Sequence, residues 1–344
     1  MLEKQFDETP VTLNSLICAW LLQEQKTSIL MSSLLEKAGM IYDYMQEKPW
    51  VKTYMTIRPM KTLVEKHVTG LGFKCVKAKK DLEIKLDPKD KDWKCKLILA
   101  YHSMNLTPVF LLEGCIATLI LSNLSKGDFL VSDSVELATI FKVLAIYQDI
   151  FASEILTKFK ASPDQMMQRV QYFAERGILE VSADQMTAKL TNSDSSQILL
   201  NFFSQLVLPL IDTYLITLNT IEQLCGKNLV IKQKTLTKEL HVGIKYLYSQ
   251  GCLPMLHSCL RETIVTACSR FAQMGLLEIT SYLTKKGNST VFLQCPSESG
   301  PKMRALLDRL GRDRNFNKQH QEMIFNEIDQ VIMRTQGPLP MPKL

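Results

Sequence analysis

The chain has 344 residues, of which 46% are hydrophobic and 22% are charged, and its formal net charge is +6. This composition supplies a buried core and excludes a chain that stays disordered. The charge is too weak to indicate nucleic-acid binding. A slightly basic soluble protein is the simplest interpretation, and a weak attraction to anionic membrane surfaces is the alternative.

The N-terminal region is predicted to be helical. A helix should cover residues 9–25, with Thr9 as its N-cap and Pro10 at the first helical position, where proline lacks only an N–H that would be unpaired anyway. Helical spacing of apolar residues continues to about Trp50. The first ten residues lack the apolar run of a secretory signal peptide.

Two strong helices follow in the middle of the chain. One begins at Pro108 and runs through Leu124. The other spans residues 132–156, with Ser132 or Asp133 as its cap. Helix therefore dominates the first half of the sequence.

Two nearly identical segments interrupt this pattern. Residues 172–181 read YFAERGILEV and residues 270–279 read RFAQMGLLEI, so Gly177 and Gly275 lie 98 positions apart. A weaker third copy occupies residues 63–76. In each copy an amphipathic helix ends at a glycine suited to the left-handed conformation, and a strand-like run follows.

A second strand-like run completes each unit. Polar turns precede these second runs, which are residues 81–86, 186–190 and 289–294. Each unit is therefore predicted to be a helix, a glycine with positive φ and a β-hairpin, which is the outline of a winged helix.

The predicted fold class is mainly α with short β-hairpins, in which winged-helix-like units of helix, glycine and hairpin repeat. The length favours more than one domain. The first unit is assigned to residues 1–98, the second to 99–195 and the third to 196–310, and a polar C-terminal surface helix and loose tail to 311–344.

The nine cysteines are predicted to be free thiols. Their number is odd, no CxxC pair occurs, and most of them lie in apolar runs. In such surroundings cysteine behaves as a small hydrophobic residue of a reducing compartment. We therefore expect no disulfide.

Two apolar stretches are long enough to raise the question of a membrane span. Residues 109–121 are too few to cross about 30 Å of hydrocarbon. Residues 198–218 contain Pro209 and several polar side chains, Asp212 among them, which favours a buried helix. No transmembrane segment is predicted.

Recognisable catalytic and metal-binding motifs are missing from the sequence. It contains neither GxxxxGK[ST] nor GxGxxG, and no HExxH. His257 and Cys259 are two positions apart, which places them on different sides of a helix and disfavours zinc or a Cys–His pair. No catalytic, cofactor-binding or metal-binding residue is assigned, and no cofactor is expected.

Glu113 stands alone in an apolar run. A buried carboxylate must be paired or protonated, because an isolated charge is costly in apolar surroundings. It could be a general base with a raised pKa, but no second carboxylate at fixed spacing completes an acid–base pair. The favoured interpretation is an ion pair or hydrogen bond that docks this helix on another element.

A lysine-rich run covers residues 71–80 and continues in residues 89–96. It could contact phosphates, with Phe73 and Trp93 as stacking platforms. Acidic residues interrupt it repeatedly, so a solvated surface of mixed charge is favoured.

Several mostly apolar motifs follow one another along the chain. They are TLNSLICAWLLQ (12–23), AYHSMNLTPVFLLEGCIATLIL (100–121), IYQDIFASEIL (146–156), LVLPLIDTYLITL (206–218) and CLRETIVTACSRFAQMGLLEI (259–279). Their order and spacing resemble the C-terminal domain of the glycerol-3-phosphate and dihydroxyacetone-phosphate acyltransferases. The resemblance covers about residues 10–310, and its specificity lies in the succession of the motifs.

The catalytic half of that family carries a histidine followed five residues later by an aspartate. None of the five histidines meets this rule, since His67, His102, His241 and His320 are followed there by uncharged residues and His257 by Glu262. Glu113-Gly114 is followed by cysteine, not by the threonine of the family's phosphate-binding segment.

The resemblance therefore implies a non-catalytic portion of the enzyme. We expect a C-terminal piece or a catalytically dead paralogue, and Met1 directly before the resemblance suggests a truncated or alternative product. The implied partners are an N-terminal acyltransferase domain, acyl-CoA and glycerol-3-phosphate only through that domain, and a membrane surface; no nucleic acid is expected.

Two branches of the family fit. LTPVFLLEGCIATL is similar to the glycerol-3-phosphate enzymes of the mitochondrial outer membrane, which acylate the sn-1 hydroxyl in phospholipid and triacylglycerol synthesis. IYQDIFASEI and the terminal Pro342-Lys343-Leu344 are similar to the peroxisomal dihydroxyacetone-phosphate enzymes of ether lipid synthesis. The mitochondrial branch is favoured.

A tandem winged-helix protein that binds nucleic acid, or a scaffold, is the alternative from another class. A recognition helix needs outward cations. The helix before Gly177 offers Arg169 and Arg176 against Asp164 and Glu175, which is too balanced.

Overall fold

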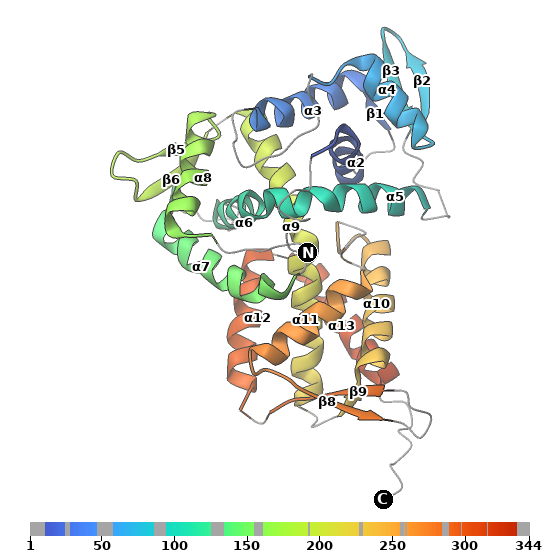
Figure 1. The fold of residues 1–344 in the computed structure, drawn as a ribbon, viewed down its shortest axis with the longest axis vertical. Coiled ribbons are helices and arrows are strands. Elements are labelled where there is room, and N and C mark those ends of the chain that lie inside the picture. Colours follow the sequence, from blue (N-terminus) through green and yellow to red (C-terminus); the bar gives the residue numbers. More distant parts are fainter. Residues whose placement is uncertain are drawn as a thin grey trace, which may run out of the picture. The chain divides into compact units, whose positions relative to one another are not determined.

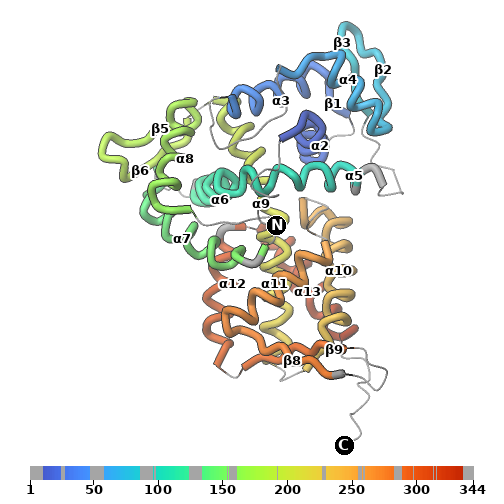
Figure 2. Tube along the Cα trace, in the orientation of Figure 1, coloured from blue at the N-terminus to red at the C-terminus, as the bar shows by residue number. Residues whose placement is uncertain are grey.

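The computed structural model describes most of the chain (Figures 1 and 2). It is mainly α-helical with small three-stranded antiparallel sheets, which confirms the predicted fold class. The described residues are 11–24, 28–46, 58–85, 94–124, 134–154, 161–191, 193–226, 230–254, 258, 260–283, 289–296, 298–314 and 316–335.

The same order of elements occurs three times along the chain. Each repeat consists of a helix, a short strand, two helices and a β-hairpin. The first repeat contains α2 (Leu13–Gln23), β1 (Ser28–Leu30), α3 (Met31–Met45), α4 (Lys61–Gly70), β2 (Lys74–Ala78) and β3 (Asp81–Lys85).

The second and third repeats follow the same plan. The second contains α6 (Thr107–Leu124), β4 (Ser134–Glu136), α7 (Leu137–Ile150), α8 (Pro163–Glu175), β5 (Leu179–Val181) and β6 (Thr187–Leu190), with α5 (Lys94–Ser103) and the 3₁₀ turns η1 (Met104–Leu106) and η2 (Phe151–Ser153) beside it in sequence. The third contains α9 (Asp194–Cys225), β7 (Ile231–Lys232), α10 (Gln233–Ser249), α11 (Arg261–Gln273), β8 (Glu278–Leu283) and β9 (Ser289–Gln294).

All three sheets have one topology. The last strand of each repeat lies in the centre and pairs antiparallel with both others, so the orders are β1-β3-β2, β4-β6-β5 and β7-β9-β8. The register places buried apolar residues opposite one another, which fixes the sheet against the helices. These pairs are Ile29 with Ile84, Val135 with Ala188, and Ile231 with Leu293.

The predicted glycine caps are confirmed in all three repeats. Gly72, Gly177 and Gly275 have φ of 90°, 63° and 72°. The residue after each glycine donates its backbone N–H to a carbonyl five residues earlier, as in Ile178 to Phe173 at 2.8 Å and Leu276 to Phe271 at 2.8 Å. This hydrogen bond is typical of a Schellman cap, in which the helix ends at a residue with left-handed backbone conformation.

The predicted start of the first helix is wrong by several residues. The helix α2 begins at Leu13, because Thr12 and Ser15 form a reciprocal capping box. Thr9 and Pro10 lie outside the described residues. The helix expected over 132–156 also begins later, because Ser134–Glu136 pair with β6 as a strand.

The C-terminal region contains more than a surface helix. α12 (Gly300–Arg314) is followed by α13 (Lys318–Thr335), which packs on α10 and buries one apolar face. A Cβ atom at Gly243 of α10 would lie 2.8 Å from the Val331 side chain, so the two helices approach closely. The buried residues of α13 include Ile324, Ile328, Val331 and Ile332.

The chain divides into two compact units. The first comprises Met1–Tyr147 and Leu156–Val207, and the second comprises Gln148–Ile155 and Leu208–Leu344. The long helix α9 supplies residues to both units. The four-part division at residues 98, 195 and 310 stays a prediction.

Each unit has an aromatic core. In the first unit Tyr44 lies 4.8 Å from Phe203 and 6.0 Å from Phe173, measured between ring centroids. In the second unit Tyr214 lies 5.1 Å from Phe151 and 5.6 Å from Phe271. The phenylalanine of each F-A-x-x-G motif therefore anchors its helix in a core.

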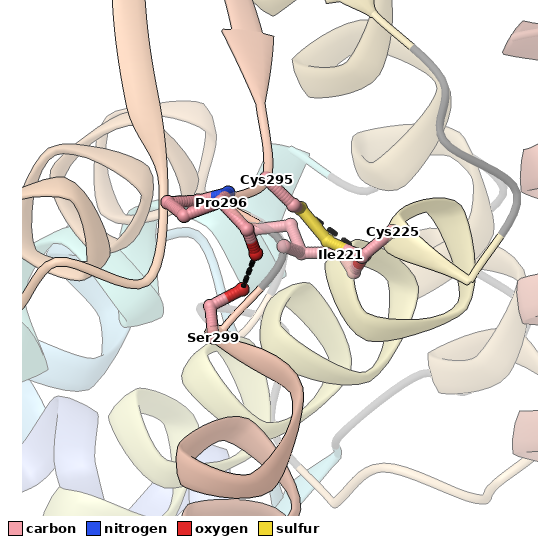
Figure 3. Close-up of a disulfide and its surroundings, with 5 residues drawn as sticks. All are labelled: Ile221, Cys225, Cys295, Pro296 and Ser299. Carbon is pink, nitrogen blue, oxygen red and sulfur yellow. Dashed lines mark hydrogen bonds between the residues drawn. A yellow bond between two sulfur atoms is a disulfide. The ribbon is translucent and has the colours of Figure 1, made fainter.

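The prediction that all cysteines are free is wrong. Cys225, at the end of α9, and Cys295, directly after β9, form a disulfide with a Cα–Cα distance of 5.4 Å (Figure 3). Beside it the Ser299 hydroxyl donates to the Pro296 carbonyl at 2.7 Å. The free thiols among the described side chains are those of Cys18, Cys75, Cys115, Cys252 and Cys268.

Candidate functional site

Two long helical segments of the described chain are apolar. The elements α5, η1 and α6 follow one another directly over Ile98–Asn123, with a kink at Phe110, whose φ of −114° and ψ of 19° are not helical. By length and composition alone, this segment and Asp194–Cys225 could cross a membrane, and the absence of a transmembrane segment stays a prediction. In both, 72% of the apolar window is buried within the protein, as in the core helices of soluble proteins.

Small residues let α6 and α9 approach closely within the first unit. A Cβ atom at Gly114 would lie 2.3 Å from the Val207 side chain and 2.7 Å from the Phe203 carbonyl oxygen. One turn further along, the Thr118 and Ser204 hydroxyls lie 2.9 Å apart. Only glycine fits at position 114, so the backbone contact defines how these helices pack.

Glu113 lies beside this contact and is paired. Its side chain is 1% exposed, and the Arg169 Nε atom of α8 lies 3.2 Å from Glu113 Oε1. Burial lowers the pKa of Arg169, while Glu113 opposes that shift. The predicted ion pair that docks the helix is confirmed, and Glu113 is committed to structure.

A second buried carboxylate occupies α9. Asp212 is fully buried, and the Arg314 Nε atom at the end of α12 donates to its Oδ1 atom at 2.5 Å. Burial raises the pKa of Asp212, and Arg314 acts in the opposite direction. Sequence analysis identified Asp212 only as a polar interruption, because no local spacing points to an arginine 102 residues away.

Glu154 is a further buried acid that was not predicted. Glu154 follows η2, and the Tyr214 hydroxyl donates to its Oε1 atom at 2.7 Å. Burial raises the pKa of Glu154 to about 7. Nearby, Arg270 of α11 donates to the Asp149 carboxylate at 2.7 Å. These contacts attach α11 to the last turn of α7, and α9 to the residue that follows η2.

The four described histidines lie on four different helices. His67, His102, His241 and His320 are half-buried and lie on α4, α5, α10 and α13. His257 and Cys259, the pair weighed as a metal or nucleophile site, lie outside the described residues. Among the described side chains, no group of three or more His, Cys, Asp and Glu could hold a metal ion.

The two arginines weighed for nucleic-acid recognition have structural contacts. Arg169 lies against Glu113. Arg176 donates from Nε to the Tyr172 hydroxyl at 3.1 Å, and Tyr172 in turn donates to the Tyr44 carbonyl at 2.6 Å. A recognition helix needs these cations at the DNA surface, so the geometry of α8 disfavours that function.

The lysine-rich run 71–80 comprises the C-cap and turn after α4, the strand β2 and the turn that follows it. Phe73, weighed as a stacking platform, is half-buried, and Trp93 lies outside the described residues. Lys74, Lys77 and Lys79 are exposed. The run is therefore a surface, in agreement with the favoured interpretation.

Comparison with protein families matches residues 1–280 to the glycerol-3-phosphate acyltransferase C-terminal region. The chain belongs to this family. No curated protein matches the sequence. In this acyltransferase C-terminal region, the buried carboxylates of Glu113, Asp212 and Glu154 contact Arg169, Arg314 and Tyr214 and so join helices within each unit.

Proposed function

We propose that the chain is the non-catalytic, structural portion of a membrane-associated glycerol-3-phosphate O-acyltransferase. The carrying observation is the family match over residues 1–280 in a sequence without the histidine–aspartate pair of the catalytic half. Acyl transfer from a thioester needs a base for the acceptor hydroxyl and donors for the developing oxyanion. This chain would fold against an N-terminal acyltransferase domain, which binds acyl-CoA and glycerol-3-phosphate.

The buried polar contacts support this role. A general base must reach a substrate, whereas Glu113 is closed off by Arg169 and by the packing of α6 on α9. Rigid helices joined by buried ion pairs are suited to carry a second domain. Two long apolar helices and the net positive charge of the chain also support membrane association.

For the organelle, we favour the mitochondrial outer membrane. The segment LTPVFLLEGCIATL supports it, and the terminal Pro342-Lys343-Leu344 supports the peroxisome instead. An N-terminally tagged chain should keep its distribution when Leu344 is deleted. A peroxisomal pattern that disappears on this deletion would favour dihydroxyacetone phosphate as the acceptor.

The test of the function is reconstitution. The purified chain should not transfer acyl groups from acyl-CoA to glycerol-3-phosphate or dihydroxyacetone phosphate. Co-expressed with an N-terminal acyltransferase half, it should form a stable complex and be required for a folded, active enzyme.

Two results would contradict the proposal. One is turnover by the isolated chain that is lost in His257→Ala or Glu262→Gln but kept in the matched control His320→Ala. The other is a catalytic half that is fully active and stable without this chain.

A further inference from the structure

The hairpin of the first repeat differs in charge from its counterpart in the second. Residues 74–85 contain five lysines and two carboxylates, whereas the equivalent residues 179–190 contain one lysine and two carboxylates. We call β2 and its turn, residues 74–80, the basic wing; Figure 1 shows β2 and β3 beside α4. Its lysines are Lys74, Lys77, Lys79 and Lys80, all exposed.

The two carboxylates that follow the basic wing are already engaged. Asp81 accepts from the Ser32 backbone N–H at 3.1 Å, at the start of α3, and lies 3.7 Å from the Lys61 ammonium. Glu83 accepts from the Ser28 hydroxyl at 2.6 Å and pairs with Lys85 at 2.7 Å. Both acids therefore stabilise the repeat internally.

The wing lysines, in contrast, have no counter-ion among the described residues. None of the ion pairs within 4.0 Å in the described part of the chain involves Lys74, Lys77, Lys79 or Lys80. Between them Val76 leaves 46% of its surface exposed. Asp81 and Glu83, two of the acidic residues that interrupt the basic run, thus form no ion pair with the lysines of its outer strand.

Protection of a sheet edge explains this pattern only in part. Lysine on an edge strand hinders pairing with another chain. However, the edge strands β5 and β8 occupy the same place in their sheets and contain no lysine. Edge protection also leaves the turn lysines and the exposed Val76 unexplained.

We propose that the basic wing docks the chain on an anionic lipid surface. Lysines beside an exposed apolar side chain match a membrane interface, because the ammonium groups contact phosphates and carboxylates while the apolar group enters the boundary. Residues 61–85 contain no arginine, whose planar guanidinium with its paired donors favours nucleic-acid recognition. The inference rests on the proposed membrane association and names the surface that provides it.

Vesicle binding by the full chain tests the proposal. Sedimentation would compare vesicles of phosphatidylcholine alone with vesicles that also contain phosphatidylserine. The chain should bind only the anionic vesicles, and added salt should weaken binding. Each lysine near such a surface contributes about fivefold to binding, so Lys74→Gln/Lys77→Gln/Lys80→Gln should weaken it by about a hundredfold.

A matched control separates the wing from net charge. Lys234, Lys302 and Lys318 are exposed lysines on α10, α12 and α13, and none forms an ion pair among the described residues. Their triple substitution to Gln removes the same charge and should change binding by less than about threefold. Circular dichroism would establish that both variants are folded, and Val76→Ser should also weaken binding.

Three results would overturn the inference: no binding of the unaltered chain to anionic vesicles, equal loss in both triple variants, or tighter binding to duplex DNA that depends on the wing. Stable assembly with a catalytic half would leave the proposed enzyme function standing in each case. Failure of that assembly, with wing-dependent vesicle binding intact, would contradict the proposed function alone.

Discussion

The second and third repeats each contain a buried carboxylate that is paired with an arginine, but the arginine comes from a different place in each. Glu113 of α6 and Asp212 of α9 are 99 positions apart, close to the 98 that separate the two glycine caps, and both are buried. Glu113 is paired by Arg169 from the same repeat, whereas the position equivalent to Arg169 in the third repeat is Ala267.

The third repeat takes its arginine from a helix beyond the repeat. Arg314 ends α12 and pairs with Asp212. What recurs is therefore a charge within an apolar helix and its neutralisation, not a particular pair of positions. Breaking a buried ion pair is costly because the charge that remains is neither paired nor solvated. The intact pair, in contrast, adds little to the stability of the protein.

The largest expected effect comes from breaking the pair of the second repeat. Glu113→Gln removes the carboxylate that faces the buried Arg169 cation in the middle of α8 and should cost about 3–5 kcal/mol of unfolding free energy. All three tryptophans lie in the sequence of the first unit, so urea unfolding followed by tryptophan fluorescence reports this change.

A surface substitution on the same helix serves as its control. Glu175→Gln changes an exposed residue of α8 and should shift the free energy by less than about 0.5 kcal/mol. A similar small cost for Glu113→Gln would show that the pair does not hold α6 on α8.

Among the described residues the third repeat alone contains a disulfide, and its removal should have the next largest effect. It links two cysteines that are 70 residues apart. A loop of that size restricts the unfolded chain, and the lost entropy raises the free energy of the unfolded state by about 4 kcal/mol at about 25 °C. Cys225→Ser should lower the stability of the second unit by a similar amount, and reductant should no longer affect the variant.

Alkylation without reduction, followed by mass spectrometry, provides the direct check. The unaltered protein should have two fewer reactive thiols than the reduced protein, and Cys75→Ser, at a half-buried free thiol, should keep the bridge. Nine alkylated cysteines would contradict the bridge and restore the expectation from the sequence.

Local patterns predicted the repeated framework well. The F-A-x-x-G motif predicts a helix end from local sequence alone, because a helix that ends at a glycine cap needs no contact with a distant residue. Glu113 could also be predicted to be paired, since its isolation in an apolar run is visible in the sequence.

Contacts between distant residues could not be predicted in this way. The strands β1, β4 and β7 have two or three residues each, too few for an alternating pattern, and they exist only through pairing with the central strand. Arg314, Tyr214 and Cys295 likewise acquire partners that no spacing along the chain indicates.

Buried hydroxyls offer another contrast between the two units. Tyr172 donates to a backbone carbonyl, which does not titrate, whereas Tyr214 donates to Glu154. The folded-state pKa of Glu154 is about 7 against an ordinary value of 4.5, so its proton favours the folded state. Its contribution to stability is full below pH 4.5, declines as pH rises to 7, and is lost above that.

Glu154→Gln keeps an oxygen acceptor for Tyr214 and removes this titration. At pH 8 the variant should be more stable than the unaltered chain by up to about 3 kcal/mol, and the difference should vanish near pH 4.5. The measurement is the difference in unfolding free energy between the two proteins across this range. A difference that is constant with pH would refute the assignment to Glu154.

The smallest expected effect returns to the ion pair of the third repeat. Asp212→Asn breaks its pair as Glu113→Gln breaks that of the second, but Arg314 is the last residue of α12 and stacks on Phe316 with its guanidinium carbon 4.2 Å from the ring centroid. A terminal arginine can extend to water, and burial already raises the pKa of the lost carboxylate. The expected cost is about 2 kcal/mol, below the 3–5 kcal/mol of a pair whose partner stays buried.

Because the second unit contains no tryptophan, this effect is measured by hydrogen exchange of peptides from residues 208–225. Faster exchange there, with unchanged exchange in residues 107–124, would confirm that each carboxylate stabilises its own unit. A cost equal to that of Glu113→Gln would mean that Arg314 cannot leave its place, and the two pairs would then be equivalent in energy as well as in position.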